Sequence, residues 1–390
     1  MEIVVQKYGG SSVADISKLE RVAKRIAQTA RKGKRVCIVV SAMGGSTDEL
    51  MALAKQITAS PPRRELDMLL SSGERIAMAL LAMAIQKHGF QAISFTGSQS
   101  GIITNDCHSG AQIIEIRPIR IQDELSKGKI VIVAGFQGMS YKREITTLGR
   151  GGSDTTAVAL ASALKASYCE ICSDVDGIYT ADPQVVPEAF RLAKISYCEM
   201  LELSEHGAQI LNSESVKWAQ RTNLLILTSA SHKKSGHSKI GKEGTGMTTC
   251  GIALSRDIVS LQIQGSESKL QSYLNESGLK FRRMVGEKPS EGFWIVSINN
   301  QPDWSQSQKL LFKKFGNNLK LEEKFVALSI VGVNLPPDTI KTAIQKAKQS
   351  NIKVIGFEIS QIRVTLLIHS NDAKDLTRSL HKIFVQSLTD

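Results

Sequence analysis

The feature that most constrains the fold is a repeated unit of a short apolar strand, a glycine turn and a helix. Residues 2–8 lead into a Gly-Gly turn and then a helix from Asp15 to Lys32, and residues 36–40 lead into a second glycine turn and a helix from Glu49 to Ile57. Strands that alternate with helices predict an α/β fold, with a mostly parallel sheet sandwiched by helices. Ligands of such sheets bind at the carboxyl ends of the strands, where these glycine turns lie.

The same pattern continues to about residue 230. A helix is expected from Leu66 to Lys87, with an interruption or kink at residues 71–75. Further strands are expected at residues 91–96, 129–134 and 169–172. All the glycine turns then meet at one edge of the sheet.

The stretch Thr146–Thr156 is the strongest candidate for a ligand site. It places three glycines around Arg150, continues with Ser153 and Asp154, and runs into an alanine-rich helix. The start of such a helix attracts anions, because it presents free N–H groups and the positive end of the helix dipole. Arg150 offers a planar fork for a carboxylate or phosphate, while Asp154 can cap the helix or receive an ammonium or a metal ion. Taken alone, the stretch also fits a well-capped helix with a flexible turn.

Other residues at the same predicted edge favour a ligand site. There is no G-x-x-x-x-G-K-[ST] segment, which excludes a P-loop protein. Lys7, two residues ahead of Gly9 and Gly10, can nevertheless neutralise a transferring phosphoryl group while the glycine amides hold its oxygens. Phosphoryl transfer mainly requires positioning and charge neutralisation, and these residues offer both.

A change of composition at residues 229–248 marks a loop that leaves the first domain. His232 and His237 could bind a metal there, but we favour an exposed basic loop. Beyond it, two short series of strands and helices predict two small ferredoxin-like α+β modules. The expected tail elements are strands 258–264, 292–298, 325–331, 352–357 and 361–368, and helices 266–276, 304–315, 337–349 and 371–385. We expect domains at residues 1–245, 246–320 and 321–390.

Composition argues against several other classes of protein. No run of about 18 apolar residues marks a membrane span, and the start of the chain reads as a strand rather than a signal peptide, so we expect a cytoplasmic protein with no membrane partner. The six cysteines are scattered as expected for reduced thiols, and the pair Cys169 and Cys172 lacks a second pair at zinc-ligand spacing. The net charge of +12 is spread along the chain, so no nucleic-acid partner is expected.

Six segments of the chain occur in the order that one known family has them: Lys7–Ser12, Ser41–Gly44, Gly73–Arg75, Phe95–Gly97, Thr147–Asp154 and Ser173–Pro183. Through them the chain resembles the aspartate kinases of the amino-acid-kinase superfamily. The resemblance is strong from residue 1 to about 230 and weak in the tail, where the family carries paired ACT modules that bind lysine or threonine and form a dimer. It therefore implies an amino-acid-kinase fold followed by ACT-like modules, and a homodimer.

The resemblance also implies a reaction and a set of site residues. The reaction is phosphorylation of the L-aspartate side chain by ATP to give 4-phospho-L-aspartate, the first step towards lysine, threonine and methionine, with Mg²⁺ held mostly by the phosphates and no metal ligand expected from the chain. Lys7 and Asp154 would be catalytic. The aspartate pocket would consist of Thr47, Glu74, Arg150 and Ser153. The phosphates and nucleotide would contact Gly9, Gly10, Ser11, Ser173, Asp174, Tyr179 and Asp182.

Two positions depart from the family pattern. Gln184 stands where the family usually has Arg after its Asp-Pro pair, and Gln209 stands where it usually has Lys. Each change removes a charge-assisted hydrogen bond worth about 1.5–3 kcal/mol. Losing both would weaken the use of ATP about a hundredfold or more, unless Lys233, Lys234 or Lys239 supplies the charge. An alternative function is therefore a catalytically weakened homologue that serves as a regulatory or interaction subunit.

The tail departs further from the family. Its first module lacks the Pro-Gly turn used to bind the effector, and residues 333–337 replace the usual glycine-rich turn of the second module. We therefore expect lysine and threonine to inhibit weakly or not at all.

Overall fold

The computed structural model describes residues 1–208, 210–232, 236–265, 267–277, 279–286, 292–298 and 304–385. The chain divides into two compact units. Unit 1 consists of Met1–Ile178, Leu192–Tyr197 and Ile210–Gly244, and unit 2 of Tyr179–Arg191, Cys198–Gln209 and Thr245–Asp390. The division into domains at residues 1–245, 246–320 and 321–390 remains a prediction.

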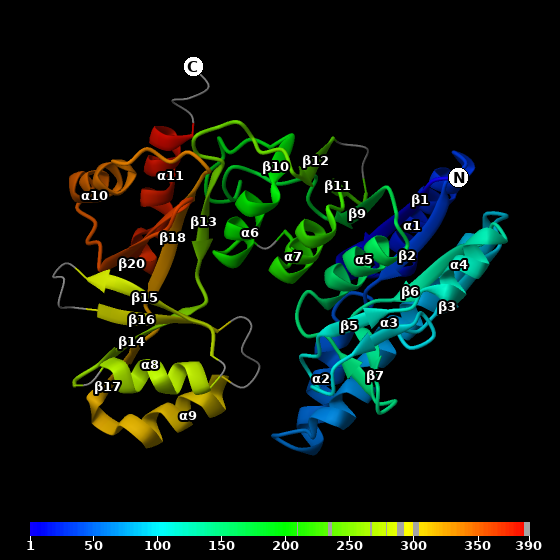
Figure 1. The fold of residues 1–390 in the computed structure, drawn as a ribbon, viewed down its shortest axis with the longest axis horizontal. Helices are drawn as coiled ribbons and strands as arrows, with labels where there is room; N and C mark the ends of the chain where they lie inside the picture. Colours follow the sequence, from blue (N-terminus) through cyan, green and yellow to red (C-terminus); the bar gives the residue numbers. More distant parts are fainter. Residues whose placement is uncertain are drawn as a thin grey trace. The chain divides into compact units, whose positions relative to one another are not determined.

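Unit 1 is built on an eight-stranded sheet with the order β10-β12-β11-β9-β1-β2-β6-β3 (Figure 1). Its strands are β1 Ile3–Tyr8, β2 Arg35–Val40, β3 Ala92–Phe95, β6 Ile130–Ala134, β9 Tyr168–Ser173, β10 Lys194–Ser196, β11 Ile226–Ala230 and β12 His237–Gly241. Neighbouring strands are parallel except β11 and β12, which are antiparallel. The prediction of an α/β fold on a mostly parallel sheet is confirmed.

Helices cover both faces of this sheet. The helices of unit 1 are η1 Gly10–Val13, α1 Ile16–Arg31, α2 Ser46–Ile57, α3 Arg63–Lys87, α4 Ile119–Ser126, α5 Gly152–Ala163 and α7 Ser213–Thr222. Helices α1 and α3 share one apolar core with Val4 and Tyr8 of β1. Helix α5 contacts β1, β2 and β9. Because side chains alternate along a strand, Lys7 points to the face opposite Tyr8.

A second, four-stranded sheet in unit 1 was not predicted. Its order is β5-β4-β7-β8, with β4 Ile102–Thr104, β5 Ile113–Ile116, β7 Gln137–Ser140 and β8 Ile145–Thr147. Its strands have three or four residues each, too few for hydrophobic periodicity to show. The sheet matters for the site because β8 leads directly into the glycine turn around Arg150.

Helix α3 runs unbroken from Arg63 to Lys87, so the predicted interruption at residues 71–75 is wrong. Gly73 serves packing, because a Cβ atom there would lie 2.9 Å from the Cβ of Ala42. Glycine at this position therefore lets α3 approach the loop that follows β2. Among the described residues α3 alone has the length and apolar composition of a membrane span, but 56% of its most apolar window is buried inside the protein. That burial is what a core helix of the sheet requires.

The described strands of unit 2 form one eight-stranded sheet with the order β13-β18-β20-β19-β15-β16-β14-β17. Its strands are β13 Gly251–Ser255, β14 Ile258–Ile263, β15 Phe281–Gly286, β16 Gly292–Ser297, β17 Leu319–Glu322, β18 Phe325–Val331, β19 Gly356–Ile359 and β20 Arg363–His369. Its helices are α6 Tyr197–Glu205, α8 Glu267–Glu276, α9 Trp304–Phe315, η2 Gly316–Asn318, α10 Thr339–Gln349, η3 Ser370–Asp372 and α11 Ala373–Phe384. The first residue of α6, Tyr197, still belongs to unit 1, and the rest of that helix belongs to unit 2. The sequence did not predict strands β13, β15 and β17.

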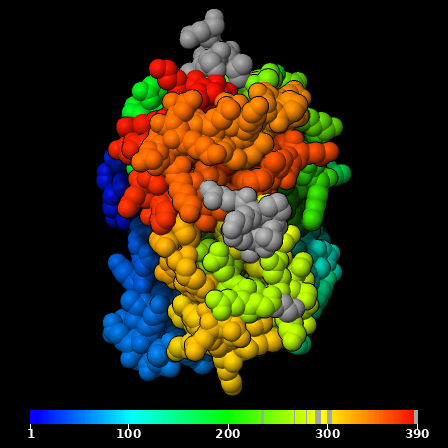
Figure 2. All heavy atoms as spheres, turned by 90° about the vertical axis from the view of Figure 1, so that its left-hand side faces the viewer, coloured from blue at the N-terminus to red at the C-terminus, as the bar shows by residue number. Residues whose placement is uncertain are grey.

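Two separate cores lie under the helices of unit 2. One joins α8 and α9 to β14, β16 and β17, and the other joins α10 and α11 to β13, β18 and β20. Figure 2 shows the outer surfaces of these helix pairs, with α10 and α11 in orange to red above α8 and α9 in yellow-green to gold. A third cluster, around Met284, Phe293 and Leu367, combines residues from both halves of the sheet. The two halves are therefore joined by one continuous sheet.

Candidate active site

A cavity of about 320 Å³ opens in unit 1 at the carboxyl ends of β1 and β2 and the start of α5. Its wall includes eight residues that the sequence assigned to a site, namely Lys7, Gly9, Gly10, Thr47, Glu74, Arg150, Ser153 and Asp154. These residues come from four segments spread over 148 positions of the chain. The fold therefore gathers the predicted catalytic and aspartate-pocket residues around one opening.

The ion pair of Lys7 and Asp154 lies at the centre of this wall. The ammonium Nζ of Lys7 is 2.6 Å from Oδ1 of Asp154, and each side chain is 12% exposed. Lys7 is on the face of β1 that α5 covers, and Asp154 is in the first turn of α5. Of the two roles predicted for Asp154, the structure shows the second, in which it receives an ammonium. The positive charge of Lys7 is thus held in the cavity at the start of a helix.

The glycine turn before α5 depends on a left-handed backbone. Gly149 has a φ of 76° and Gly151 a φ of 74°, a region that residues with a Cβ atom rarely adopt. A Cβ atom on Gly151 would also collide with the side chain of Asn212. Nδ2 of Asn212 donates a hydrogen bond of 3.0 Å to the carbonyl oxygen of Arg150, while its Oδ1 caps α7 by accepting from the Glu214 amide. The turn is therefore fixed in shape, and it presents the exposed Arg150 at the cavity.

Glu74 is a buried carboxyl group in the cavity wall, only 3% exposed. Its Oε1 accepts a hydrogen bond of 3.2 Å from the amide of Ala42, while its Oε2 has no hydrogen-bond partner among the described residues. Burial is the main reason that its pKa is raised from 4.5 to about 7. A buried carboxylate oxygen with no partner costs free energy, so the site is suited to bind a cation against it.

The cavity wall also includes residues to which the sequence assigned no individual role: Ser41, Ala42, Gly44, Phe136, Gly149, Gly151 and Gly152. Phe136 is notable because its φ of 66° is unusual for a bulky residue. Two hydrogen bonds hold this conformation. The Phe136 amide donates to Oγ1 of Thr156, and the Phe136 carbonyl oxygen accepts from the amide of Leu148. The sequence signal for all these wall residues was their position directly after β2, β6 and β8.

Of the seven residues predicted to contact the phosphates and nucleotide, Gly9 and Gly10 are part of this cavity wall and the other five are not. Ser11 is exposed in η1, Ser173 ends β9, and Asp174 is exposed just after it. Tyr179 and Asp182 belong to unit 2, where Oδ1 of Asp182 accepts a hydrogen bond from the amide of Gln184. Nucleotide contacts by these five residues therefore remain a prediction.

One of the two positions that depart from the family pattern, Gln184, lies among the described residues. Gln184 is exposed, as a replacement arginine would be. Gln209, Lys233 and Lys234 lie outside the described residues, whereas Lys239 is exposed on β12. Neither His232 nor His237 belongs to a metal-binding group, because the described residues contain no cluster of three or more His, Cys, Asp or Glu side chains suited to a metal ion.

Comparison with known proteins identifies the family. The amino acid kinase family matches residues 2–228. The aspartokinase of Mycolicibacterium smegmatis is 40% identical over 98% of this chain and 96% of its own length. The chain belongs to the aspartokinases.

One further relative supports this assignment, and a solved structure shows the same fold. Aspartokinase 2 of Bacillus subtilis is 38% identical, with 98% of each chain covered. The structure of E. coli aspartokinase III in complex with aspartate and ADP has the same fold, with a TM-score of 0.85 over 98% of this chain and 99% of that one, at 24% identity. The sequence matches cover 96% to 98% of the length of these two curated relatives, so they include the tail.

Proposed function

We propose that this aspartokinase transfers the γ-phosphoryl group of ATP to the side-chain carboxylate of L-aspartate, giving 4-phospho-L-aspartate and ADP. The observation that carries the proposal is the single cavity that combines the Lys7–Asp154 pair with Glu74 and Arg150. An α-amino acid carries one anion and one cation at its Cα atom, and the cavity wall offers one group for each. The other two charged residues of the wall, Lys7 and Asp154, suit phosphoryl transfer.

In this proposal Arg150 binds the α-carboxylate of aspartate through its planar fork, and Glu74 binds the α-ammonium through the unpartnered Oε2. Thr47 and Ser153 complete the pocket by hydrogen bonding. A carboxylate oxygen of the side chain attacks the γ-phosphorus, the bond from that phosphorus to the β,γ-bridging oxygen breaks, and the electron pair leaves with ADP. No proton transfer and no covalent enzyme intermediate are required.

Lys7 and the start of α5 stabilise the charge that develops in this step. The ammonium of Lys7 faces the phosphoryl group, and Asp154 holds that ammonium in place. Gly9 and Gly10 belong to the cavity wall, and their amides would donate to phosphate oxygens, the Gly9 amide in exchange for its long bond of 3.5 Å to the carbonyl oxygen of Cys172. Preorganised donors of this kind are typical of phosphoryl-transfer enzymes.

ATP and Mg²⁺ are the proposed cofactors. The cavity wall contains two carboxylates, Asp154 and Glu74, and Asp154 is already paired with Lys7. Mg²⁺ prefers several oxygen ligands in an octahedron, so these residues fit an ion that is carried chiefly by the phosphates of ATP. When bound, Mg²⁺ would neutralise the β- and γ-phosphates. Ser11, Ser173, Asp174, Tyr179 and Asp182 are the proposed contacts of the phosphates and nucleotide.

We also propose the wider setting of the reaction. The product would serve lysine, threonine and methionine biosynthesis in the cytoplasm, where ATP and aspartate are available, and the tail modules, as ACT-like domains, would form a homodimer. Membrane and nucleic-acid partners are not proposed. The alternative of a weakened regulatory subunit is not favoured, since full-length relatives are named aspartokinases and the cavity keeps Lys7, Glu74, Arg150 and Asp154.

The test is the release of ADP from Mg-ATP with different acceptors. L-Aspartate should be turned over, whereas L-glutamate, which is one methylene longer, and N-acetyl-L-aspartate, which lacks the ammonium that Glu74 binds, should react far more slowly. Equal turnover of aspartate and N-acetyl-L-aspartate would refute the assignment of Glu74. The absence of turnover with aspartate would refute the proposed reaction.

A further inference from the structure

Asp67 is a buried carboxylate on α3 that the reaction described above does not use. It lies seven residues before Glu74, so two turns separate the two acids on one face of the helix. The side chain of Asp67 is completely buried, and it is not part of the cavity wall. A buried carboxylate is costly unless several donors satisfy it, so its partners show what it is for.

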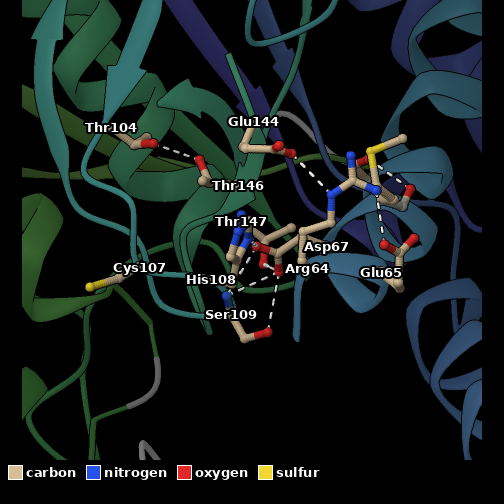
Figure 3. A network of polar contacts seen from close by, with 12 residues as sticks. Arg64, Glu65, Asp67, Thr104, Cys107, His108, Ser109, Glu144, Thr146 and Thr147 are labelled. Atoms are coloured by element: carbon tan, nitrogen blue, oxygen red, sulfur yellow. Dashed lines mark hydrogen bonds and ion pairs between the residues drawn. The ribbon is translucent and has the colours of Figure 1, made fainter. Parts of the chain in front are cut away.

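The partners of Asp67 come from two segments far away in the sequence (Figure 3). In the loop between β4 and β5, the amide of Ser109 donates to both carboxylate oxygens at 3.0 and 3.1 Å, the Ser109 hydroxyl donates at 3.2 Å, and Nδ1 of His108 lies 2.8 Å away. In β8, Thr147 donates through its hydroxyl at 2.6 Å and its amide at 3.2 Å. One carboxylate thus ties α3 to both segments.

Both segments support the turn that presents Arg150. Thr147 is the last residue of β8, three positions before Arg150. Gly149 packs on the loop, since a Cβ atom there would lie 3.7 Å from Cα of Gly110 and 3.9 Å from the carbonyl oxygen of Ser109. The loop also joins β8 directly, through a hydrogen bond of 2.8 Å from the amide of Ala111 to the carbonyl oxygen of Thr147.

Ser109 itself needs this support. Its φ of 62° places it in the left-handed region, where a residue other than glycine is under strain. The three contacts from Ser109 to Asp67 hold that conformation. Without the carboxylate, the loop would lose the bonds that keep Ser109 beneath Gly149.

We propose that Asp67 is a positioning residue for substrate binding: it fixes Thr147 and Ser109, and through them the backbone of the turn that carries Arg150. It touches neither substrate nor the reacting atoms. Because α3 carries both Asp67 and Glu74, this helix sets the distance between the residue proposed to bind the ammonium and the one proposed to bind the carboxylate of aspartate. The inference about the substrate rests on the proposed function.

The test compares Asp67→Ala and Asp67→Asn with Glu170→Gln. Glu170 is a control in the same unit, because it also accepts bonds from three side chains, Gln6, Arg25 and Ser229, but lies outside the cavity wall. Asp67→Ala should raise KM for aspartate about tenfold or more while KM for ATP stays within about twofold. Asp67→Asn should have a smaller effect, because the rotatable hydroxyls of Ser109 and Thr147 can accept from its amide. Glu170→Gln should leave KM for aspartate unchanged.

Coupling to Arg150 separates positioning from general destabilisation. In an Arg150→Ala background, Asp67→Ala should cause no further rise in KM for aspartate, because the group it positions is gone. If Asp67→Ala does not fold, Thr147→Val removes one bond and should still raise KM for aspartate about threefold or more. Unchanged KM for aspartate in folded Asp67→Ala or Thr147→Val, or equal effects on both substrates, would overturn the proposal.

Amide hydrogen exchange tests the positioning independently of activity. The amides of Ser109 and Thr147 should exchange about tenfold faster or more in Asp67→Ala than in the native chain, while those of the sheet core remain protected. Unchanged exchange at both amides would overturn the positioning role. If the native chain does not phosphorylate aspartate, the proposed function fails, and this measurement still decides whether Asp67 fixes the turn.

Discussion

The ammonium of Lys7 and the carboxylate of Asp154 form an ion pair of 2.6 Å across the interface between β1 and α5. The two residues are 147 positions apart, and they meet because β1 is central in the sheet and α5 covers the face towards which Lys7 points. The pair holds a positive charge at the start of a helix, inside a cavity that also contains Glu74 and Arg150.

Lys7→Ala should lower kcat about a hundredfold to a thousandfold, because the charge that develops on the phosphoryl group loses its nearest cation. Asp154→Asn should also lower kcat, by releasing Lys7 from its position. The matched control is Lys34→Ala, which removes a lysine directly before β2 whose ammonium pairs at 3.2 Å with Glu2, the residue before β1. Steady-state kinetics measure the effect, and a native kcat in Lys7→Ala would contradict the assigned role.

Arg150→Ala should raise KM for aspartate about tenfold to a hundredfold, because it removes one charge-assisted hydrogen-bonding contact to the substrate. Arg150→Lys should recover only part of the loss, because an ammonium cannot bind a carboxylate with two parallel bonds. Arg117→Ala, which removes a surface arginine paired with Glu115, is the control. An unchanged KM for aspartate in Arg150→Ala would remove Arg150 from the substrate pocket.

Glu74 makes aspartate binding depend on pH. Its pKa is about 7 in the folded protein, because burial disfavours the charged form. Binding of the α-ammonium requires the ionised form, so KM for aspartate should fall about tenfold as the pH rises from 6 to 8. In Glu74→Gln the KM should be higher and nearly independent of pH over this range. A native KM profile in Glu74→Gln would contradict the proposed contact.

The same group makes the stability of the free protein depend on pH. Between pH 4.5 and 7 Glu74 holds its proton in the folded state and loses it in the unfolded state, so the free energy of unfolding should decrease by about 3 kcal/mol as the pH rises through this window. Glu74→Gln should remove this decrease in urea unfolding. Glu124 is a control of opposite sign, since Lys127 and Lys129 lower its pKa to about 2, so that its contribution is lost in acid.

Gln184→Arg combined with Gln209→Lys should lower KM for ATP, since each change restores a cation at a position where the family usually has one. The expected gain is about tenfold for each restored bond. KM for aspartate should not change, and this is the internal control. If KM for ATP does not change either, the missing charges are not needed for nucleotide binding in this chain.

The parts of the site that the sequence predicted are those carried by strand ends and helix starts. Lys7 follows an apolar run, and Arg150 and Asp154 flank glycines that only a tight turn before a helix requires. Asp67 could not be found in this way, because its partners His108 and Thr147 are 41 and 80 residues further along the chain. The role of a buried carboxylate depends on its hydrogen-bond partners, and only the folded chain brings those partners next to it.

The fold was predicted where periodicity is long and missed where it is short. The parallel sheet of unit 1 follows from apolar strands of five or six residues, but the small sheet that carries Thr147 has strands too short to show a pattern. In α3 the sequence suggested an interruption at residues 71–75, whereas the helix is unbroken and its close contact with Ala42 requires a glycine at Gly73. In unit 2, β15 was missed because Arg282 and Arg283 interrupt its apolar character, although Glu358 and Glu267 pair with them.

The most direct test of the account is the trapping of the acyl phosphate with hydroxylamine in the presence of Mg-ATP and L-aspartate. The native chain should form aspartyl hydroxamate in a one-to-one ratio with ADP, and Lys7→Ala should form almost none. Release of ADP without hydroxamate, or no turnover by a folded native chain, would contradict the central claim that this cavity phosphorylates the aspartate side chain.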